Sequence, residues 1–324
     1  MARAIRIHEA GGPEVMHLED IEVPPPGAGE VQLRHTAIGL NYIDVYDRSG
    51  LYPQSMPAGL GREAAGVVMA LGPKVRGLRA GDRVAYVHSV PGSYSEMRNV
   101  PASRLVKIPA GISDEQAAVL MLKGMTACYL LRHTHRVRRG EVIVVHAAAG
   151  GVGLMLAQWG RALGATVIGI VGNEEKAKLA KKNGCRHVLV RGRDAIAGGV
   201  RKLTKGRGAD VVYDAVGKDT FFESLDCLRK RGLMVSYGSA SGPVPPFSLA
   251  ELVRRGSLFV TRPTLFDYNV DRAELEAMAR DTFGAVKKKW VRVQIHQRYR
   301  LADAAQAHRD LEARKTTGAS VILP

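Results

Sequence analysis

The sequence predicts an α/β protein in which a small β-barrel is followed by a doubly wound parallel sheet. Three observations support this prediction. The chain has 324 residues and a mass of 35.0 kDa. A chain of this length is usually too long for a single hydrophobic core, which predicts two domains. Its first hundred residues read as short β-prone runs separated by glycine and proline turns. From Glu141 onward, strand, glycine turn and helix alternate, as in parallel sheets that helices cover on both faces.

Four β-prone runs predict the strands of a small, partly closed barrel. Turn sequences such as Gly72-Pro73 and Ala80-Gly81-Asp82 punctuate them, and no long helical pattern comes between them. The runs are Ala4–His8, Val31–Ile38, Gly66–Leu71 and Arg83–Val87. The pattern changes at Ser113, because a serine followed three residues later by Gln116 is typical of the capping box that begins a helix.

The second region predicts a series of parallel strands, most of them joined by helices. Val142–Val145 is an uninterrupted apolar run, as expected of a strand buried on both faces. Leu154–Leu163 has helical periodicity and stops at Gly164. The elements expected to follow are Thr166–Val171, Glu174–Asn183, His187–Val190, Val211–Asp214, Thr220–Arg229, Leu233–Tyr237 and Gly256–Thr261.

The carboxyl-terminal tail is expected to return to the first domain. The roughly 60 residues from Pro263 mix helix and strand patterns, and so short a segment rarely builds a core of its own. We expect elements at Ala273–Phe283 (helix), Val291–Ile295 (strand), Ala302–Ala313 (helix) and Ser320–Leu323 (strand). The predicted domains are therefore 1–122 together with 263–324, and 123–262.

Composition excludes several classes of protein. Hydrophobic residues make up 46% of the chain and charged residues 24%, which argues against disorder. The cysteines, Cys128, Cys185 and Cys227, lie far apart, which excludes a disulfide scaffold and favours the cytoplasm. We expect no secretory signal, because the amino-terminal segment MARAIRIHEAGG has no apolar h-region. We expect no membrane span, because the apolar stretch 142–157 is too short. The net charge of +16 favours anionic partners, but a solvated basic surface explains it equally well.

The strongest local signal is the glycine-rich turn His146–Gly153, with the sequence HAAAGGVG. It lies between the predicted buried strand and an amphipathic helix, the context in which such a turn binds the pyrophosphate of a dinucleotide in a Rossmann domain. Gly150 and Gly151 let the backbone approach phosphates, and Gly153 lets the helix pack close to the sheet. A glycine turn without a ligand is the simpler alternative, which the β–turn–α–β context disfavours.

The end of the second predicted strand indicates which dinucleotide binds. NAD enzymes usually place Asp or Glu there to hold the ribose hydroxyl groups. Here the strand ends in Gly172-Asn173, and Lys176 and Arg191 follow, which favours the 2′-phosphate of NADPH. Glu174-Glu175 argues against this choice by bringing negative charge close to the phosphate. Alternatively, these acids stabilise a helix N-terminus.

Over its whole length the chain resembles the zinc-free quinone oxidoreductases, the ζ-crystallin-like branch of the medium-chain dehydrogenase/reductase superfamily. The segments that carry the resemblance are Gly11–Glu14, Gly39–Tyr46, Ser49–Pro53, Ala80–Val84, His146–Gly153 and Thr261–Pro263. The resemblance implies a GroES-like β-barrel catalytic domain beside a Rossmann NADP(H)-binding domain. It also implies NADPH-dependent reduction of quinones and a homodimer that pairs through Gly256–Thr261. The alternative for this segment is an internal strand that the returning tail covers.

The resemblance further implies which residues meet the cofactor and the acceptor. Asn41, Tyr46 and Tyr52 are the expected catalytic residues, although the two tyrosines could equally well only pack the cleft wall. The expected cofactor contacts are Tyr42, Ile43, Asp44, Val45, Tyr46, Thr126, Tyr129, Gly150, Gly151, Val152, Gly153, Gly172, Asn173, Lys176, Arg191, Val216, Tyr237, Gly238, Ser239, Thr264, Leu265, Phe266 and Arg314. Close relatives place a Tyr on the adenosine at the position of Arg191, so here we expect a charge contact in place of an aromatic one.

No metal is expected. Zinc-dependent relatives carry a Gly-His-Glu turn and an early cysteine, whereas this chain has Gly61-Arg62-Glu63 and no cysteine before Cys128. Hydride delivery to an electron-poor quinone needs no Lewis acid, so a quinone suits such a chain. Two alternatives stay open: a reductase of α,β-unsaturated carbonyls (alkenals or enones), and an RNA-binding ζ-crystallin-like protein. The basic charge permits the second, although no aromatic RNA-binding motif is present.

Overall fold

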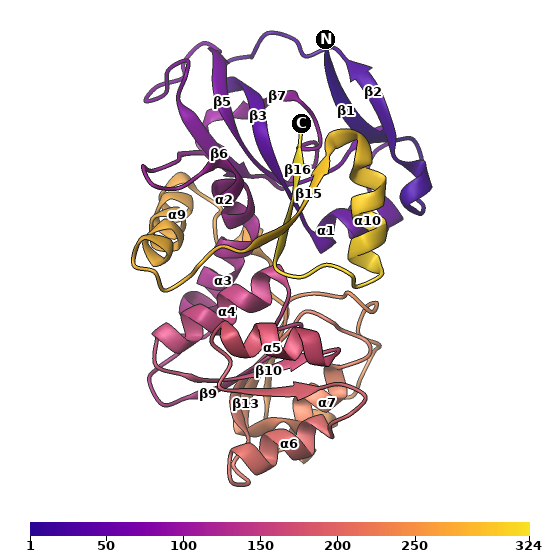
Figure 1. Ribbon diagram of the computed structural model, residues 1–324, viewed down its shortest axis with the longest axis vertical. Coiled ribbons are helices and arrows are strands. Elements are labelled where there is room, and N and C mark those ends of the chain that lie inside the picture. Colours follow the sequence, from indigo (N-terminus) through magenta and orange to yellow (C-terminus); the bar gives the residue numbers. More distant parts are fainter. The chain divides into compact units, whose positions relative to one another are not determined.

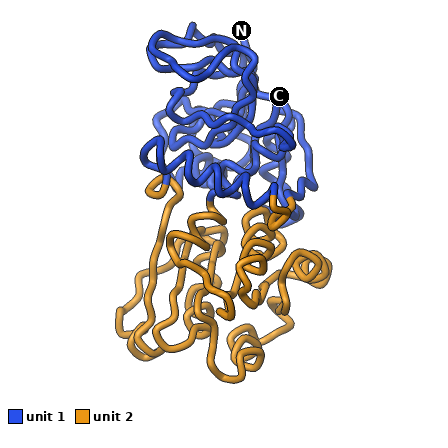
Figure 2. Tube along the Cα trace, turned by 90° about the vertical axis from the view of Figure 1, so that its left-hand side faces the viewer, with its two compact units in different colours: residues 1–125, 269–287, 293–324 blue, residues 126–268, 288–292 orange.

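The computed structural model describes every residue from Met1 to Pro324 and divides the chain into two compact units (Figure 2). Unit 1 comprises Met1–Met125, Asn269–Lys287 and Val293–Pro324, and unit 2 comprises Thr126–Tyr268 and Lys288–Arg292. The chain thus returns from unit 2 to unit 1 after Tyr268, six residues beyond the predicted boundary at 262. The physical reason is local, because the Tyr268 ring stacks on Tyr129 of unit 2 with centroids 4.6 Å apart.

Unit 1 is built on two sheets (Figure 1). One has the strand order β15-β16-β3-β5-β6-β8, with β7 also paired to β3, and the other has the order β2-β1-β4. The strands are β1 (Ala2–Ile7), β2 (His17–Ile21), β3 (Glu30–Leu40), β4 (Ala58–Gly59), β5 (Glu63–Leu71), β6 (Arg83–Val87), β7 (Met97–Pro101), β8 (Leu105–Lys107), β15 (Ile295–Arg300) and β16 (Ala319–Leu323). The helices are α1 (Tyr42–Ser49), α2 (Asp114–Val119), α9 (Arg272–Lys287) and α10 (Ala304–Glu312).

Strand β3 organises unit 1, because it pairs with β5, β7 and the last strand of the chain. Val321 of β16 lies opposite Gly39 of β3, so the carboxyl terminus completes a sheet begun at the amino terminus. Side chains such as Leu33 and Ile38 are fully buried in the core that this sheet covers. Helix α2 begins at the predicted capping box, where the Ser113 hydroxyl accepts the N–H of Gln116 at 3.2 Å.

The strand expected at Val291–Ile295 is displaced in the structure. Strand β15 begins at Ile295 and continues to Arg300, where only every second side chain is partly shielded. His296, Arg298 and Arg300 point outward from this edge strand, so its polar sequence hides it from a search for apolar runs.

Unit 2 is a six-stranded parallel sheet with the order β11-β10-β9-β12-β13-β14. This is the doubly wound order that the sequence predicts, and it reverses between β9 and β12. The strands are β9 (Val142–Val145), β10 (Thr166–Val171), β11 (His187–Val190), β12 (Ala209–Asp214), β13 (Leu228–Ser236) and β14 (Phe259–Thr261). The helices are α3 (Met125–Tyr129), α4 (Gly151–Ala162), α5 (Glu174–Lys182), α6 (Ile196–Leu203), α7 (Phe221–Asp226) and α8 (Ala250–Arg254).

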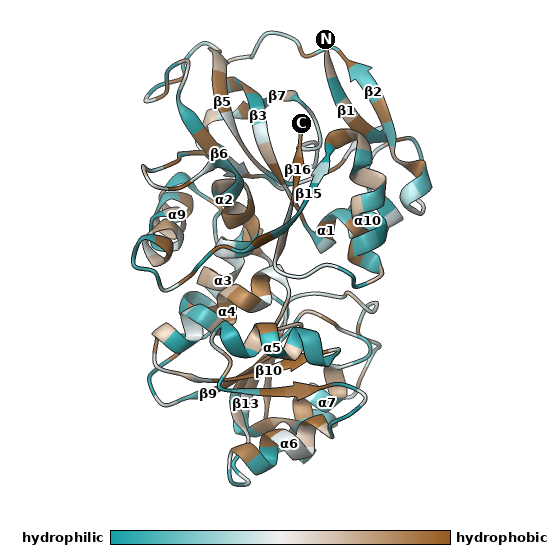
Figure 3. Ribbon diagram, in the orientation of Figure 1, coloured by the Kyte–Doolittle hydropathy of each residue, from teal (hydrophilic) through white to brown (hydrophobic).

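Hydrophobicity follows this layering. Figure 3 shows brown, apolar colour concentrated on β10, while much of α5 is teal. Val144, Ile168 and Val212 of three adjacent strands are fully buried in one cluster. No helix of the structure combines the length and the apolar character needed to cross a membrane.

Short helical turns complete both units. The π-helical turns are η3 (Leu120–Gly124) and η4 (Leu130–Thr134), on either side of α3. The 3-10 turns are η1 (Pro13–Val15), η2 (Ala102–Arg104), η5 (Leu265–Asp267) and η6 (Leu301–Asp303).

The three cysteine side chains, Cys128, Cys185 and Cys227, are all buried. Burial raises the pKa of the Cys185 and Cys227 thiols to about 12. Near neutral pH these two sulfurs therefore remain protonated.

Candidate functional site

The glycine-rich turn connects β9 to α4 in unit 2. Helix α4 begins at Gly151, and Gly150 is its N-cap in an extended conformation. A Cβ atom on Gly153 would lie 2.2 Å from the Ala147 carbonyl oxygen, so only glycine allows the helix to pack this close to the turn. The first N–H groups of α4 have no partner within the helix and lie at its positive end. This is the geometry of a phosphate-binding turn.

The predicted 2′-phosphate site follows β10. Asn173 is the N-cap of α5, and its side-chain oxygen accepts the N–H of Lys176 at 2.9 Å. A Cβ atom on Gly172 would meet no atom within 4 Å, so the strand end borders open space. Glu174, whose charge argued against a phosphate here, is ion-paired with Arg193. Its negative charge is therefore partly neutralised.

Arg191 follows β11 at the same edge of the sheet. One guanidinium nitrogen, Nη2, donates to the carbonyl oxygen of Asp219 at 3.1 Å. The other, Nη1, is buried and has no hydrogen-bond partner in the protein. A buried, unsatisfied cationic donor is costly unless a ligand satisfies it.

A buried network centred on Asp214 shapes the loop after β12, and the sequence analysis did not identify it. One carboxylate oxygen of Asp214 accepts the N–H groups of Val216 (2.7 Å) and Gly217 (3.2 Å). The other accepts the hydroxyl of Ser224 at 2.8 Å, and Ser224 in turn contacts Nε2 of His146 at 2.9 Å. Burial lowers the pKa of His146, so its ring stays neutral. The network holds the Val216 backbone to the core of the sheet.

The unit 2 residues expected to bind a cofactor gather at one edge of the sheet. Because all six strands are parallel, their carboxyl ends meet there, and doubly wound sheets bind ligands at that edge. The residues that follow these strand ends are Gly150, Gly151, Val152, Gly153, Gly172, Asn173, Lys176, Arg191, Val216, Tyr237, Gly238, Ser239, Thr264, Leu265 and Phe266. Thr126 and Tyr129 instead lie on α3, before β9, where both are buried.

In unit 1, the predicted substrate segment forms α1. Asn41 is its N-cap, and Asp44 completes a capping box with it. The rings of Tyr42 and Tyr46 lie 5.5 Å apart, and those of Tyr46 and Tyr52 lie 5.3 Å apart. The structure thus brings the three tyrosines of this segment into one aromatic row. Ile43 and Val45 lie between them on the same helix.

Arg314 lies after α10, also in unit 1. Burial and the charge of Glu312 raise the pKa of Tyr42, and Arg314 opposes that rise. Arg314 therefore lies within electrostatic reach of the amino-terminal end of α1.

Glu63 anchors Asn41 and is a functional candidate that sequence reasoning missed. Its Oε1 accepts the side-chain amide of Asn41 at 2.8 Å and the ammonium group of Lys123 at 2.9 Å. Its Oε2 accepts the backbone N–H of Leu122. Glu63 is completely buried, so all of these contacts are shielded from water. No local sequence signal links two residues that are 60 positions apart.

A second buried chain of hydrogen bonds connects α1 with α10. Arg48 can only donate, so Nδ1 of His308 accepts from it (3.0 Å) and Nε2 carries the proton toward Tyr94 (3.1 Å). The Tyr94 hydroxyl donates to Asp44 at 2.9 Å. Burial, with the nearby Asp47 carboxylate, raises the pKa of Asp44 to about 7. Burial and Arg48 lower the pKa of His308 to about 3, so that ring is neutral.

Comparison with known proteins identifies the family. The model of the alcohol dehydrogenase GroES-like domain matches residues 27–110, and that of the zinc-binding dehydrogenase matches residues 151–278. A quinone oxidoreductase of Pseudomonas aeruginosa is 50% identical over the full length of both chains. The chain belongs to the quinone oxidoreductase family. The resemblance noted in the sequence and the predicted fold class are both confirmed.

The names of two further similar proteins mention a cofactor or a substrate. The crystal structure of Escherichia coli quinone oxidoreductase complexed with NADPH has a TM-score of 0.98 and 45% identity, with both chains completely covered. A 2-haloacrylate reductase of a Burkholderia species is also 45% identical, over all of this chain and 99% of its own. The relatives of this chain thus include a protein named as a reductase of 2-haloacrylate.

The residues of this quinone oxidoreductase family member do not fit a zinc ion. Arg62 occupies the turn Gly61–Glu63, and its guanidinium forms a buried ion pair with Asp47 at 2.6 Å. Glu63 is engaged by Lys123. No group of three His, Cys, Asp or Glu side chains is arranged to hold a metal ion. A buried cation at this turn disfavours a second positive charge.

Proposed function

We propose that the protein reduces quinones by hydride transfer from NADPH, without a metal ion. The observation that carries the proposal is the carboxyl edge of the unit 2 sheet. It combines a phosphate-binding glycine turn with an acid-free end of β10 and the cations Lys176 and Arg191. This edge belongs to a chain that is 50% identical to a curated quinone oxidoreductase.

The donor groups present suit NADPH. The start of α4 would hold the pyrophosphate with its free N–H groups, and Gly153 keeps the helix close enough to present them. The unsatisfied Nη1 of Arg191 and the ammonium group of Lys176 suit a 2′-phosphate. The Asp214 network would hold the backbone of Val216, one of the proposed cofactor contacts, in a fixed position. When bound, the nicotinamide supplies the hydride.

The acceptor side is proposed to be Asn41 together with the tyrosine row, formed by Tyr42 and Tyr46 of α1 and by Tyr52 after the helix. The hydroxyl group of Tyr46 or Tyr52 can donate a hydrogen bond to a carbonyl oxygen of the acceptor. Glu63 accepts a hydrogen bond from the Asn41 amide and so holds Asn41 in one orientation. These groups are neutral, which suits a flat uncharged carbonyl better than a carboxylate. Tyr52→Phe should lower kcat modestly if the hydroxyl positions the acceptor, and leave it unchanged if the ring only packs.

A quinone assay with metal chelation tests the function. After exhaustive treatment with EDTA, the protein should oxidise NADPH with 1,4-benzoquinone and show little turnover of saturated primary alcohols with NADP⁺. A quinone is already electron-poor, so no Lewis acid is needed for hydride transfer. Alcohol oxidation that EDTA abolishes, together with inert quinones, would overturn both the substrate class and the metal-free mechanism.

Reduction of α,β-unsaturated carbonyl compounds is the second candidate. It is favoured by the 45% identity to a 2-haloacrylate reductase. Parallel kcat/KM measurements with 1,4-benzoquinone, 2-cyclohexenone and 2-chloroacrylate separate the candidates. A preference for either alkene over the quinone would transfer the assignment to this second class.

Edge pairing would make the protein a homodimer. Strand β14 ends the sheet, paired only with β13, and Phe259 on it is 61% exposed. An apolar unpaired edge invites a second copy. Light scattering should show a dimer, and Phe259→Asp should shift it toward the monomer. A parent protein that scatters as a monomer at micromolar concentration contradicts the dimer.

We also propose a cytoplasmic location, which the buried cysteine side chains suit.

A further inference from the structure

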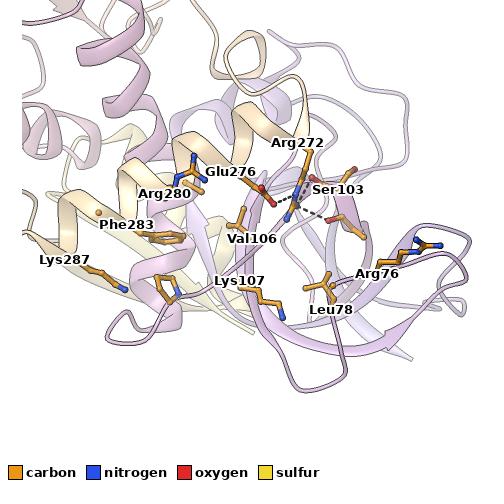
Figure 4. A pocket seen from close by; sticks show the side chains of 15 residues that line it. Arg76, Leu78, Ser103, Val106, Lys107, Arg272, Glu276, Arg280, Phe283 and Lys287 are labelled. Carbon is orange, nitrogen blue, oxygen red and sulfur yellow. Dashed lines mark hydrogen bonds and ion pairs between the residues drawn. The ribbon is translucent and has the colours of Figure 1, made fainter.

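A groove in unit 1 is lined by neither the glycine turn nor the tyrosine row (Figure 4). It has a volume of about 920 Å³, within the range of small-molecule sites. Its walls come from the β5–β6 loop, from η2 and β8, and from one face of α9. The lining residues are Arg76, Gly77, Leu78, Ala102, Ser103, Val106, Lys107, Pro109, Arg272, Glu276, Ala279, Arg280, Phe283, Gly284 and Lys287.

The helical wall is a continuous stripe of α9. Its lining residues recur at spacings of three and four, from Arg272 through Glu276, Arg280 and Phe283 to Lys287, so they share one face. Arg272 fastens the amino-terminal end of this stripe to the opposite wall. Its guanidinium donates to the carbonyl oxygens of Ser103 (3.1 Å) and Leu105 and pairs with Glu276 at 2.7 Å. These bonds of Arg272 fix the two walls of the groove relative to each other.

The floor of the groove is apolar. Val106 and Phe283 are buried core side chains whose surfaces face it, and Leu78 and Ala279 extend the same surface. Figure 4 shows Phe283, Val106 and Leu78 following one another along the groove. Such a floor recognises a hydrocarbon or aromatic body.

The rim of the groove is cationic. Five lining side chains carry positive charge and one, Glu276, carries negative charge. Arg272 is neutralised by Glu276, and Lys107 by Asp82 at 2.9 Å. Arg76, Arg280 and Lys287 are exposed and form no ion pair. Three uncompensated cations around an apolar floor attract an anion with an apolar body.

We propose that this groove is a second ligand site, which binds an amphipathic anion: an aromatic or aliphatic body that carries one carboxylate, sulfonate or phosphate group. The body lies on the Val106–Phe283 floor, and the anionic group lies between the cations of α9. Arg280 and Lys287, at the carboxyl-terminal half of α9, are the main contacts of the anionic group. This ligand is additional to NADPH and to the electron acceptor.

Gly284 provides a way to block the groove without disturbing the fold. It lines the groove, and a Cβ atom on it would meet no atom within 4 Å. Leucine is a better helix former than glycine, so Gly284→Leu should not lower the unfolding temperature. Its side chain would occupy the space above the floor.

The probe is 8-anilinonaphthalene-1-sulfonate, titrated by fluorescence in the presence of saturating NADPH, which blocks binding at the cofactor edge. N-phenyl-1-naphthylamine, which lacks the sulfonate, is the matched neutral probe. The variants are Gly284→Leu, the double charge reversal Arg280→Glu/Lys287→Glu, and the control Lys202→Glu/Lys205→Glu. The control changes net charge equally at exposed residues outside the groove.

We expect the sulfonate probe to bind the parent and the control equally. Loss of the sulfonate and the charge reversal should each weaken binding about tenfold, the scale of one lost charge-assisted hydrogen bond. The steric block should weaken binding at least as much, because the leucine side chain occupies the space of the probe's apolar body. Unchanged affinity in Gly284→Leu or in Arg280→Glu/Lys287→Glu, with thermal unfolding at the parental temperature, would overturn the proposal. Complete displacement of the probe by NADPH would also overturn it.

Discussion

Removal of Lys123 should destabilise unit 1 by an amount that the structure lets us estimate. Its ammonium group lies 2.9 Å from Glu63, and the two side chains are 7% and 0% exposed. Breaking a buried ion pair by deleting one partner costs about 3–5 kcal/mol, because the remaining charge is uncompensated. In Lys123→Met, Glu63 still accepts hydrogen bonds from Asn41 and from the Leu122 N–H, so the lower end, about 3 kcal/mol, applies.

Thermal unfolding measured by circular dichroism tests this estimate. A change of 1 kcal/mol moves the midpoint of a domain of this size by about 2–4 °C, so Lys123→Met should lower it by roughly 10 °C. The double variant Glu63→Gln/Lys123→Met removes both charges and should recover a large part of the loss. Lys202→Met, at an exposed lysine, should stay within about 0.5 kcal/mol of the parent.

The reasoning is wrong if Lys123→Met unfolds within 2 °C of the parent, taking about 2–4 °C per kcal/mol. It is equally wrong if the double variant is less stable than Lys123→Met. Either result would mean that Glu63 does not bear an uncompensated charge when Lys123 is removed.

Three further predictions concern the cofactor edge and α1. Lys176→Ala should weaken NADPH binding by about 1–3 kcal/mol and leave NADH unaffected in calorimetric titrations, whereas equal losses would remove Lys176 from the phosphate site. Gly153→Ala places a Cβ atom 2.2 Å from the Ala147 oxygen, so NADPH affinity should fall at least about tenfold; unchanged affinity would show that the turn yields. The raised pKa of Asp44, about 7, means that folding favours its protonated form. The parent should therefore lose stability relative to Asp44→Asn as the pH rises from about 4 to 7, and parallel pH profiles of the unfolding temperature would contradict this.

The sequence was most informative where local pattern and burial agree. The apolar runs of β9 and β10 end at the residues predicted, because parallel strands buried on both faces are almost uniformly apolar. The edge strand β11, which is only partly buried, also ends at the residue predicted. Helix α6 was missed because Gly198-Gly199 interrupts its helical signal. Its apolar residues Ile196 and Val200 pack into the core, and this packing stabilises the helix despite the two glycines.

The candidate site also has parts that the sequence could predict and parts that it could not. The glycine turn and the acid-free end of β10 each consist of consecutive residues, so a local pattern predicts them. The buried pairs Glu63–Lys123 and Arg62–Asp47 join residues far apart, and a folded barrel is needed to bring them together. The capping role of Asn41 was within reach, because Asp44 stands at the third helical position.

The burial of the cysteines has a consequence for an enzyme that handles quinones. Quinones and conjugated carbonyls alkylate thiolates, and the thiolate is the reactive form of cysteine. Cys185 and Cys227 lie within unit 2 with pKa values of about 12, and Cys128 is also buried. The protein thus presents no ready nucleophilic sulfur to its own substrate. Burial of the three cysteine side chains thus removes the most direct route by which a quinone could alkylate the protein.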